Sequence, residues 1–527
     1  MIPEPPRSDE LSAPRITAPG ERAFLRLALL LVGLCALAGE TLAQTTPPKR
    51  PNVVFIAVDD LRPQMGCYGD FWMKTPNLDR LASHGRVFRR HYVQVPTCGA
   101  SRYSLLTGLR PSGDADYWNE PFTVHKAELT RRPTESLVHL FRQNGYHTVA
   151  IGKVSHNPDN SGADLPRSWD EVIALKGPWN LAVRAYVQPV NPETYPPFEA
   201  GDANDEAYPD GLLAAEALKT LQRLKERPFF LALGFYKPHL PFNAPKRFWD
   251  LYDPQKIPPP PSPDIPAGIN TNISLHPSFE LVEQYRGMPA GSLDSATYRR
   301  QLRHGYAATV SYVDAQIGKV LDELDRLGLS TNTLVVIWGD NGWHLGDLGI
   351  WGKHTAFEYA LRTPLIVRMP GMKSPGIPTD ALVESIDLYP TLAELCGLPK
   401  TPGLGGESLV RILQDPSGPG KAQAFGYHRP WRNPVQPNPW GKTMRTDRYR
   451  LTVWTKEREG GEILQAELYD HSADPEETNN LVARYPDLVA QLLPRMAADG
   501  LTWRITSGSQ PAVGEAVPKA PKQPKEK

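Results

Sequence analysis

The sequence predicts an α/β fold: a large, mostly parallel sheet flanked by helices, followed by a smaller C-terminal unit. Two observations lead to this fold class. Four short apolar segments, rich in β-branched and aromatic residues, are too short for helices, and helical patterns lie between them. Near-continuous apolar strands that alternate with helices are typical of a parallel sheet covered on both faces.

Each of the four predicted strands stops at polar residues. The strands cover residues 52–58, 146–151, 228–234 and 333–338, and the predicted helices cover 134–144, 207–227 and 309–327. In such sheets ligands bind beyond the carboxyl ends of the strands. We therefore expect the four polar termini to meet at one rim.

The side chains at this predicted rim indicate a metal and an anion. Hard oxygen ligands come from Asp59, Asp60, Asp340 and Asn341, which favours calcium or magnesium over zinc. Cations and proton carriers come from Lys153, His156, Lys237, His239 and Lys353. A bound cation surrounded by Lys and His favours an anionic ligand. Taken singly, each of these residues is equally typical of a turn, a helix cap or a solvated side chain.

The cysteines do not form a disulfide framework. Outside the N-terminal apolar run, only Cys67, Cys98 and Cys396 remain, so at least one thiol is left over. Cys98 precedes a predicted helix over residues 101–106, where unpaired N–H groups stabilise negative charge. Arg102 lies one turn further along the same face. A buried structural cysteine is the alternative.

The two ends of the chain carry their own signals. Arg22 and Arg26 precede an apolar run over residues 27–38 that ends in small residues before Gln44. This pattern predicts a secretory signal region over residues 1–43, and the run is too short to span a bilayer. We therefore expect an exported protein, periplasmic or secreted, without a stable membrane span. Residues 506–527, rich in Pro, Lys and Ala, predict a disordered tail.

Composition narrows the function classes. The chain of 527 residues has 58 basic and 58 acidic side chains, so its formal net charge is zero. No excess of Lys or Arg exists to neutralise phosphates, which argues against a nucleic-acid partner. The 55 prolines are about twice the typical share of roughly 5% and predict a globular, loop-rich protein.

Longer motifs resemble a known family. Cys98-Gly99-Ala100-Ser101-Arg102, followed by Leu106-Thr107-Gly108, resembles the signature of the type I, formylglycine-dependent sulfatases. The resemblance extends over nearly the whole chain. It is strongest to the iduronate-2-sulfatases, through the segments Val58 to Pro63, Gly152 to His156 and Lys237 to Phe242.

The resemblance implies a fold and a site. The fold would be alkaline-phosphatase-like, with a catalytic domain over 48–406 and a C-terminal subdomain with an antiparallel sheet over 407–505. A maturation enzyme would convert Cys98 to formylglycine. One calcium ion per chain would be held by Asp59, Asp60, Asp340, Asn341 and residue 98.

The same resemblance implies residue roles and a substrate. Arg102 would hold the hydrated aldehyde, while Lys153 and Lys353 bind sulfate oxygens. His239 would protonate the departing sugar oxygen, and His156 would help remove the proton from the second hydroxyl. The substrate would be a sulfated saccharide, with a uronic acid 2-O-sulfate of a glycosaminoglycan as the first expectation.

Three positions depart from the family patterns, and alternatives stay open. Ala100 stands in place of the commoner proline, Leu109 in place of an arginine that Arg110 could replace, and Asn341 in place of the histidine of the human-type iduronate enzyme.

The alternatives are a sulfatase of other specificity, such as one for algal polysaccharides, and a phosphoric or phosphonic ester hydrolase on the same scaffold. A glycan-binding protein whose residue 98 is never oxidised is the non-enzymatic alternative.

Overall fold

The computed structural model describes residues 50–125, 134–156, 165–173, 175, 184–289, 291–430 and 438–505. The predicted signal region and the predicted tail lie outside these residues. Within the described ranges, no helix combines the length and the apolar character needed to cross a membrane.

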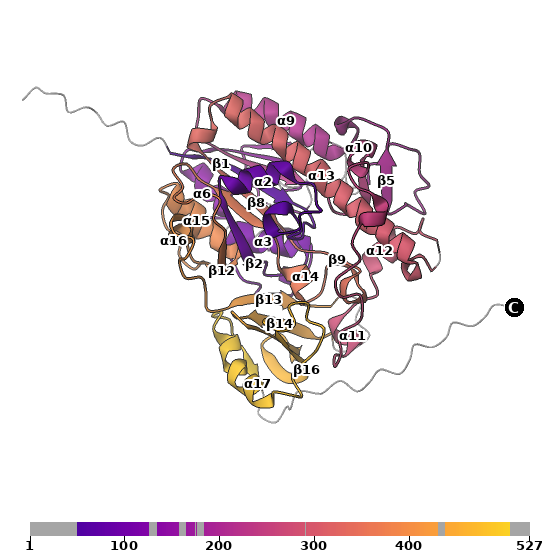
Figure 1. Ribbon diagram of the computed structural model, residues 1–527. Coiled ribbons are helices and arrows are strands. Elements are labelled where there is room, and N and C mark those ends of the chain that lie inside the picture. The colour runs from indigo at the N-terminus through magenta and orange to yellow at the C-terminus, as the bar shows by residue number, and fades with distance from the viewer. Residues whose placement is uncertain are drawn as a thin grey trace, which may run out of the picture. The chain divides into compact units, whose positions relative to one another are not determined.

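The large sheet has eight strands in the order β12-β2-β11-β8-β1-β6-β3-β4 (Figure 1). Its centre holds the four predicted strands, all parallel: β1 (Asn52–Val58), β3 (His147–Gly152), β6 (Phe229–Phe235) and β8 (Thr333–Gly339). Strands that the sequence analysis did not predict extend it on both sides: β2 (Arg86–Tyr92), β4 (Glu171–Ile173), β11 (Leu365–Arg368) and β12 (Thr379–Glu384). Because only β11 runs antiparallel to its neighbours, the predicted mostly parallel sheet is confirmed.

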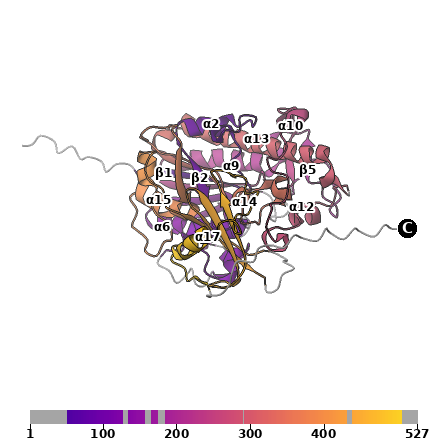
Figure 2. The ribbon, with the colours of Figure 1, turned by 60° about the horizontal axis from the view of Figure 1, so that its bottom comes forward.

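Helices cover both faces of this sheet. Val54, Ile56 and Val58 of β1 belong to one apolar core, and the alternate residues Val53, Phe55 and Ala57 belong to another. The first core includes side chains of α2 (Pro76–Ser83), α9 (Pro209–Leu224) and α13 (Ala296–Arg326). The second includes side chains of α3 (Cys98–Thr107), α6 (Leu137–Gln143) and α15 (Leu388–Leu395). Figures 1 and 2 show the resulting three layers.

Helix α13 begins 13 residues before the helix predicted over 309–327. Its first half is rich in arginine and gives no clear apolar face in the sequence. Arg303 is nevertheless buried and donates hydrogen bonds to the carbonyls of Pro258 (2.8 Å) and Leu345 (3.0 Å). Gly305 permits close packing, since a Cβ there would lie 2.8 Å from the Trp249 ring. Specific tertiary contacts therefore stabilise the half that the pattern missed.

The small sheet contains the antiparallel strands β13 (Ala424–His428), β14 (Trp440–Arg445), β15 (Tyr449–Glu457) and β16 (Gly460–Asp470). The two-residue strand β17 (Arg504–Ile505) adds to β16 in parallel. Helix α17 (Pro486–Leu492) continues as a 3₁₀ segment to Ala497. The core of this sheet includes Ala100 of α3 and Tyr117, so the small sheet packs beside the helix that carries Cys98.

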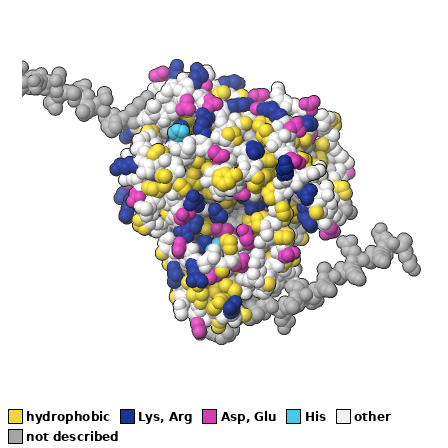
Figure 3. Space-filling model, in the orientation of Figure 1, with side chains coloured by type: hydrophobic (Ala, Val, Ile, Leu, Met, Phe, Trp, Pro, Cys, Tyr) yellow, Lys and Arg dark blue, Asp and Glu magenta, His cyan; other side chains and the backbone are white. Residues whose placement is uncertain are grey.

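The remaining α-helices and strands of the described residues are short. They are α4 (Pro121–Val124), β5 (Phe198–Gly201), β7 (Phe242–Pro245), α10 (Lys246–Trp249), α11 (Thr271–Ser274), α12 (Phe279–Gln284), β9 (His344–Leu345), β10 (Trp351–Gly352), α14 (Glu358–Leu361) and α16 (Val410–Gln414). On the face shown in Figure 3, acidic and basic side chains are interspersed rather than gathered by sign.

Candidate active site

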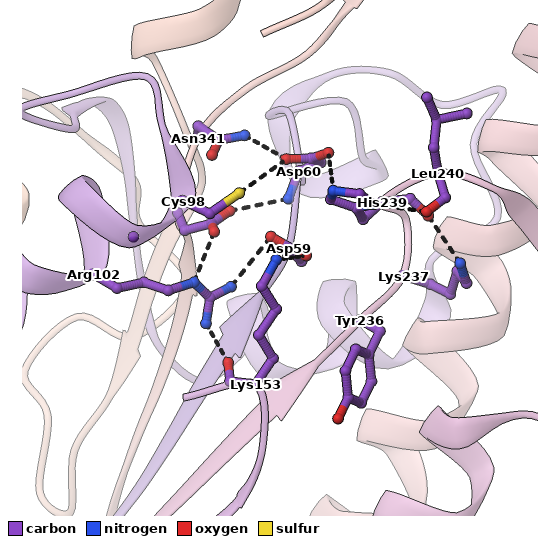
Figure 4. A network of polar contacts seen from close by, with 12 residues as sticks. Asp59, Asp60, Cys98, Arg102, Lys153, Tyr236, Lys237, His239, Leu240 and Asn341 are labelled. Atoms are coloured by element: carbon purple, nitrogen blue, oxygen red, sulfur yellow. Dashed lines mark hydrogen bonds and ion pairs between the residues drawn. The ribbon is translucent and has the colours of Figure 1, made fainter. Parts of the chain in front are cut away.

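The predicted rim exists. Asp59 and Asp60 follow β1, and Asp340 and Asn341 follow β8, at the carboxyl ends of neighbouring parallel strands. Lys153 follows β3, and His239 lies in the loop after β6. Figure 4 shows Asp59, Asp60, Lys153, His239 and Asn341 converging with Cys98 and Arg102 of α3. Asp340 joins them through a hydrogen bond from Arg102. The sheet therefore brings together residues that are distant in the chain, such as Asp60 and Asn341, which lie 281 positions apart.

Asp60 has a strained backbone at this rim. Its φ of 60° lies in the left-handed region that non-glycine residues seldom adopt. Two hydrogen bonds hold it: the Asp60 N–H donates to Asp340 Oδ1 (3.0 Å), and the Tyr306 hydroxyl donates to the Asp60 carbonyl (2.9 Å). In this conformation the Asp60 carboxylate accepts a hydrogen bond from the Asn341 amide (2.6 Å).

These side chains form a candidate metal centre. Ligand-type atoms of Asp59, Asp60, Cys98 and Asp340 all lie within 4.8 Å of one another, and all four residues are buried. Oδ1 of Asn341 is buried and accepts no hydrogen bond from any of the described residues. A buried oxygen without a donor costs free energy unless a ligand satisfies it. The donor set, dominated by carboxylate and amide oxygens, fits a hard cation such as calcium.

Three cations face the carboxylates. Arg102 donates from Nε to Asp340 Oδ2 (2.8 Å) and lies 3.4 Å from Asp59 through Nη2, while Lys153 donates to Asp59. Lys353 Nζ lies 2.8 Å from both carboxylate oxygens of Asp60. Burial alone would raise the pKa of Asp59, but the charges of Lys153, His239 and Arg102 hold that pKa well below its usual value. Burial and the charge of Asp59 raise the pKa of Asp340 to about 6, against the opposing charge of Arg102.

The charges of the site define what it can bind. Glu280 also reaches it, 3.4 Å from Lys353, so four carboxylates (Asp59, Asp60, Asp340 and Glu280) face three cations (Arg102, Lys153 and Lys353). A bound divalent cation would make this cluster net positive, which suits an anionic ester.

Cys98 is the first residue of α3, and its Sγ lies 3.8 Å from Asp60 Oδ1. Burial and the charge of Asp59 raise the pKa of its thiol well above the usual value. The stabilisation of negative charge expected at the helix N-terminus is therefore outweighed. Because the thiolate is the nucleophilic form of cysteine, this environment disfavours an unmodified Cys98 as a nucleophile. Cys67 and Cys396 are unpaired and outside this cluster.

A cavity of about 470 Å³ opens onto Cys98. His156, His239 and Lys353 line it, as predicted for groups that act on a bound ester. His239 Nε2 lies 3.8 Å from Asp60 Oδ2. Burial and the charge of Lys153 lower the pKa of His156 well below its usual value, so His156 is held in its neutral form.

Several residues of this cavity were not predicted from the sequence. They are Thr97, Trp118, Asn119, Glu120, Phe279, Glu280, Gln284 and His354. None has a motif that marks it, although Thr97 directly precedes the Cys98 helix. Lys237 lies behind the cavity, where its Nζ donates to the carbonyls of His239 (2.9 Å) and Pro241 (2.6 Å). Arg110 pairs with Glu384 through two 2.7 Å hydrogen bonds and so makes no contact with the cluster.

A second group of ligand-type side chains does not form a comparable centre. Glu358, His471 and Glu477 lie close together beside the small sheet. Arg450 donates to both carboxylates and already supplies the positive charge there.

Family comparisons agree with the fold and the site, which together define a hydrolase of anionic esters. The sulfatase family model matches residues 51–398, and the C-terminal model of N-sulphoglucosamine sulphohydrolase matches residues 346–499. The chain belongs to the sulfatase family and is an enzyme that hydrolyses sulfate esters.

Individual relatives cover nearly all of the chain. Iduronate 2-sulfatase of Homo sapiens is 31% identical over 90% of this chain and 99% of its own length. A sulfatase of Formosa agariphila is 31% identical over 91% of this chain and 93% of its own length. The crystal structure of phosphonate monoester hydrolase from Agrobacterium radiobacter shares the fold, with a TM-score of 0.70 at 22% identity, over 89% of this chain and 100% of that one.

Proposed function

We propose that the protein is an exported, calcium-dependent sulfatase that removes 2-O-sulfate groups from uronic acids of glycosaminoglycan-type saccharides. The observation that carries this proposal is the cluster of Cys98, three buried aspartates and three cations at one cavity. Similarity to human iduronate 2-sulfatase over 90% of the chain supports the uronate specificity. The apolar run that precedes Gln44 supports export, and a mature N-terminus near Gln44 in exported protein would test it.

Two groups complete the site in this proposal. Formylglycine made from Cys98 supplies, when hydrated, a nucleophilic hydroxyl, and calcium polarises the sulfate. Asp59, Asp60, Asp340, Asn341 and residue 98 would hold the ion. Lys153 and Lys353 would then turn towards the sulfate oxygens, where their charges stabilise negative charge that develops on the ester.

The two histidines divide the proton transfers. His239 lies on the cavity side of Asp60 and would donate a proton to the sugar oxygen as the ester bond breaks. His156, which is held neutral by burial and by Lys153, would accept the proton of the remaining hydroxyl at residue 98. This step would expel sulfate and restore the aldehyde. Arg102, which lies on the Cys98 helix, links this helix to the carboxylates of Asp340 and Asp59.

The mass of one peptide tests the modification. Trypsin releases His91–Arg102, and protein produced with a maturation enzyme should show this peptide with SH₂ replaced by O at residue 98. An unmodified thiol in purified, active enzyme would refute the proposed chemistry. An unmodified thiol in protein that binds glycans without turnover would instead favour the alternative in which residue 98 is never oxidised.

A panel of defined esters tests the specificity. Disaccharides that carry 2-O-sulfated iduronate should be desulfated faster than those with 6-O- or N-sulfate. Preferential cleavage of an algal polysaccharide sulfate would replace the uronate assignment. A phosphonate monoester belongs in the same panel because the Agrobacterium radiobacter hydrolase shares the fold, and preferential cleavage of it would overturn the proposal.

A further inference from the structure

Glu280 is a buried carboxylate with no role in the proposed steps. It lies in the short helix α12 and is 6% exposed. Its Oε1 lies 3.0 Å from Nε2 of His239, and its Oε2 lies 3.4 Å from Nζ of Lys353. One side chain therefore contacts both the proposed proton donor and a proposed sulfate-binding lysine.

The His239 ring is held at both of its nitrogens. Nδ1 lies 2.7 Å from the Leu240 carbonyl, which can only accept a hydrogen bond, so Nδ1 carries a proton. Nε2 faces the Glu280 carboxylate, which also accepts when it is ionised. Figure 4 shows the ring between the Leu240 carbonyl and Asp60. These contacts fix the plane of the ring and keep an N–H donor on its cavity side.

We propose that Glu280 is a positioning residue that holds the Nε2–H of His239 at the cavity wall, from where this proton can pass to the oxygen of the leaving sugar. This inference rests on the proposed function, in which His239 delivers that proton. In the step concerned, a bond would form from a hydroxyl oxygen at residue 98 to sulfur, and the proton of that hydroxyl would pass to a neighbouring carboxylate such as Asp60, whose Oδ1 lies 3.8 Å from Cys98 Sγ. The bond from sulfur to the sugar oxygen would break, and the Nε2 proton of His239 would move to that oxygen. Glu280 gives up no atom and touches neither reacting oxygen.

The leaving group separates this role from a general structural one. A sugar hydroxyl is a poor leaving group and needs a proton as the ester bond breaks, whereas 4-nitrophenolate leaves without one. Loss of a positioned acid should therefore slow the sugar sulfate selectively, because general acid catalysis contributes about 10²–10⁴-fold. Loss of Lys353 contacts or of folded protein should slow both esters equally.

The experiment compares wild-type enzyme with Glu280→Gln, Glu280→Asp and the control Glu283→Gln, an exposed carboxylate on the same helix. Each preparation is assayed on a 2-O-sulfated disaccharide and on 4-nitrophenyl sulfate, so the ratio of turnovers is independent of the folded fraction. E280Q should lower kcat on the disaccharide about 30-fold or more, with KM and aryl sulfate turnover within about threefold of wild type. E280D, which keeps the carboxylate, should recover part of the loss, and E283Q should match wild type.

Equal losses on the two esters, or no loss with E280Q, would overturn the inference and leave the proposed function standing. A loss in KM alone would also overturn it, because it would assign Glu280 to substrate binding. A wild-type enzyme that cleaves neither sulfate ester would overturn the proposed function, and this inference with it.

Discussion

At the scale of single residues, the surroundings of Cys98 explain why the proposed chemistry needs a modified side chain. The sulfur lies among buried carboxylates, and both burial and the charge of Asp59 raise its pKa. A thiol in that state is a weak nucleophile. A hydrated aldehyde would instead present an oxygen to the metal and to the sulfate at the same position.

Replacement of Cys98 by Ala should abolish turnover while leaving the fold intact. We expect sulfate release to fall at least about 10³-fold, since the nucleophile is lost. The free energy of unfolding should change by only about 1 kcal/mol, because a single sulfur atom is removed from the core. Sulfate release and denaturant unfolding measure the two effects. Cys67→Ala, outside the cluster, is the matched control, and retained turnover in C98A would contradict the account.

His91 is a buried histidine whose charge state should make stability depend on pH. It is fully buried on β2, and burial lowers its pKa to about 4, partly offset by hydrogen bonding to Thr363 and by Glu384. The unfolded chain, with an ordinary His pKa of about 6.5, then binds more protons than the folded protein between these values. Stability contributed by neutral His91 is therefore lost as pH falls from 6.5 towards 4.

A His91→Gln variant tests this linkage. Between pH 7 and pH 5 the wild type should lose about 2 kcal/mol of unfolding free energy through His91 alone, and the variant should not. Denaturant unfolding at both pH values measures the free energy of unfolding of each protein. The wild type should lose about 2 kcal/mol more than the variant between pH 7 and pH 5. An unchanged difference would show that His91 is not held neutral.

At the scale of elements, close contact between strands sets the position of Lys153. The Lys153 N–H donates to the Gly234 carbonyl at the end of β6 (2.8 Å). A Cβ on Gly234 would lie 2.0 Å from the carbonyl carbon and oxygen of Lys153. Only glycine therefore allows the backbone of Lys153 to lie against β6 and its side chain to reach Asp59.

Gly234→Ala should damage both stability and activity. The clash is with backbone, so the end of β3 must move, and we expect a loss of about 3 kcal/mol together with a fall in kcat. Thermal unfolding and sulfate release measure both. The control is Gly113→Ala, where the nearest atom to a new Cβ is an ordinary 3.6 Å away in His125. Wild-type activity in G234A would show that the position of Lys153 is not critical.

Elements also show what the sequence could and could not predict. The four central strands and the residues after them were predicted because apolar runs that end in Asp, Lys or His are local signals. Helix α13 was predicted only from residue 309, since contacts such as that between Gly305 and Trp249 leave no periodic pattern. Glu280 was missed for the same reason: a single acid in a six-residue helix acquires its partners, His239 and Lys353, only through the fold.

At the scale of the whole molecule, a bound cation should couple activity to stability. Three buried aspartates share the site, so a divalent ion would remove part of their mutual repulsion. Calcium at about 100 times its dissociation constant should raise the free energy of unfolding by about 2.7 kcal/mol. A chelator should lower activity.

Variants at aspartates separate this effect from general salt effects. Asp340→Asn should weaken the response of thermal stability to calcium, and Asp322→Asn, an exposed acid on α13, should leave it unchanged. Chelation without loss of activity, or an equal calcium response in both variants, would contradict the predicted ligand set.

The most direct test of the account is a crystal structure of the mature enzyme grown with calcium. We predict one ion within about 2.3–2.6 Å of oxygens from Asp59, Asp60, Asp340, Asn341 and residue 98, with residue 98 present as formylglycine. An ion bound elsewhere, or an unmodified Cys98 beside a metal-free aspartate cluster in active crystals, would contradict it.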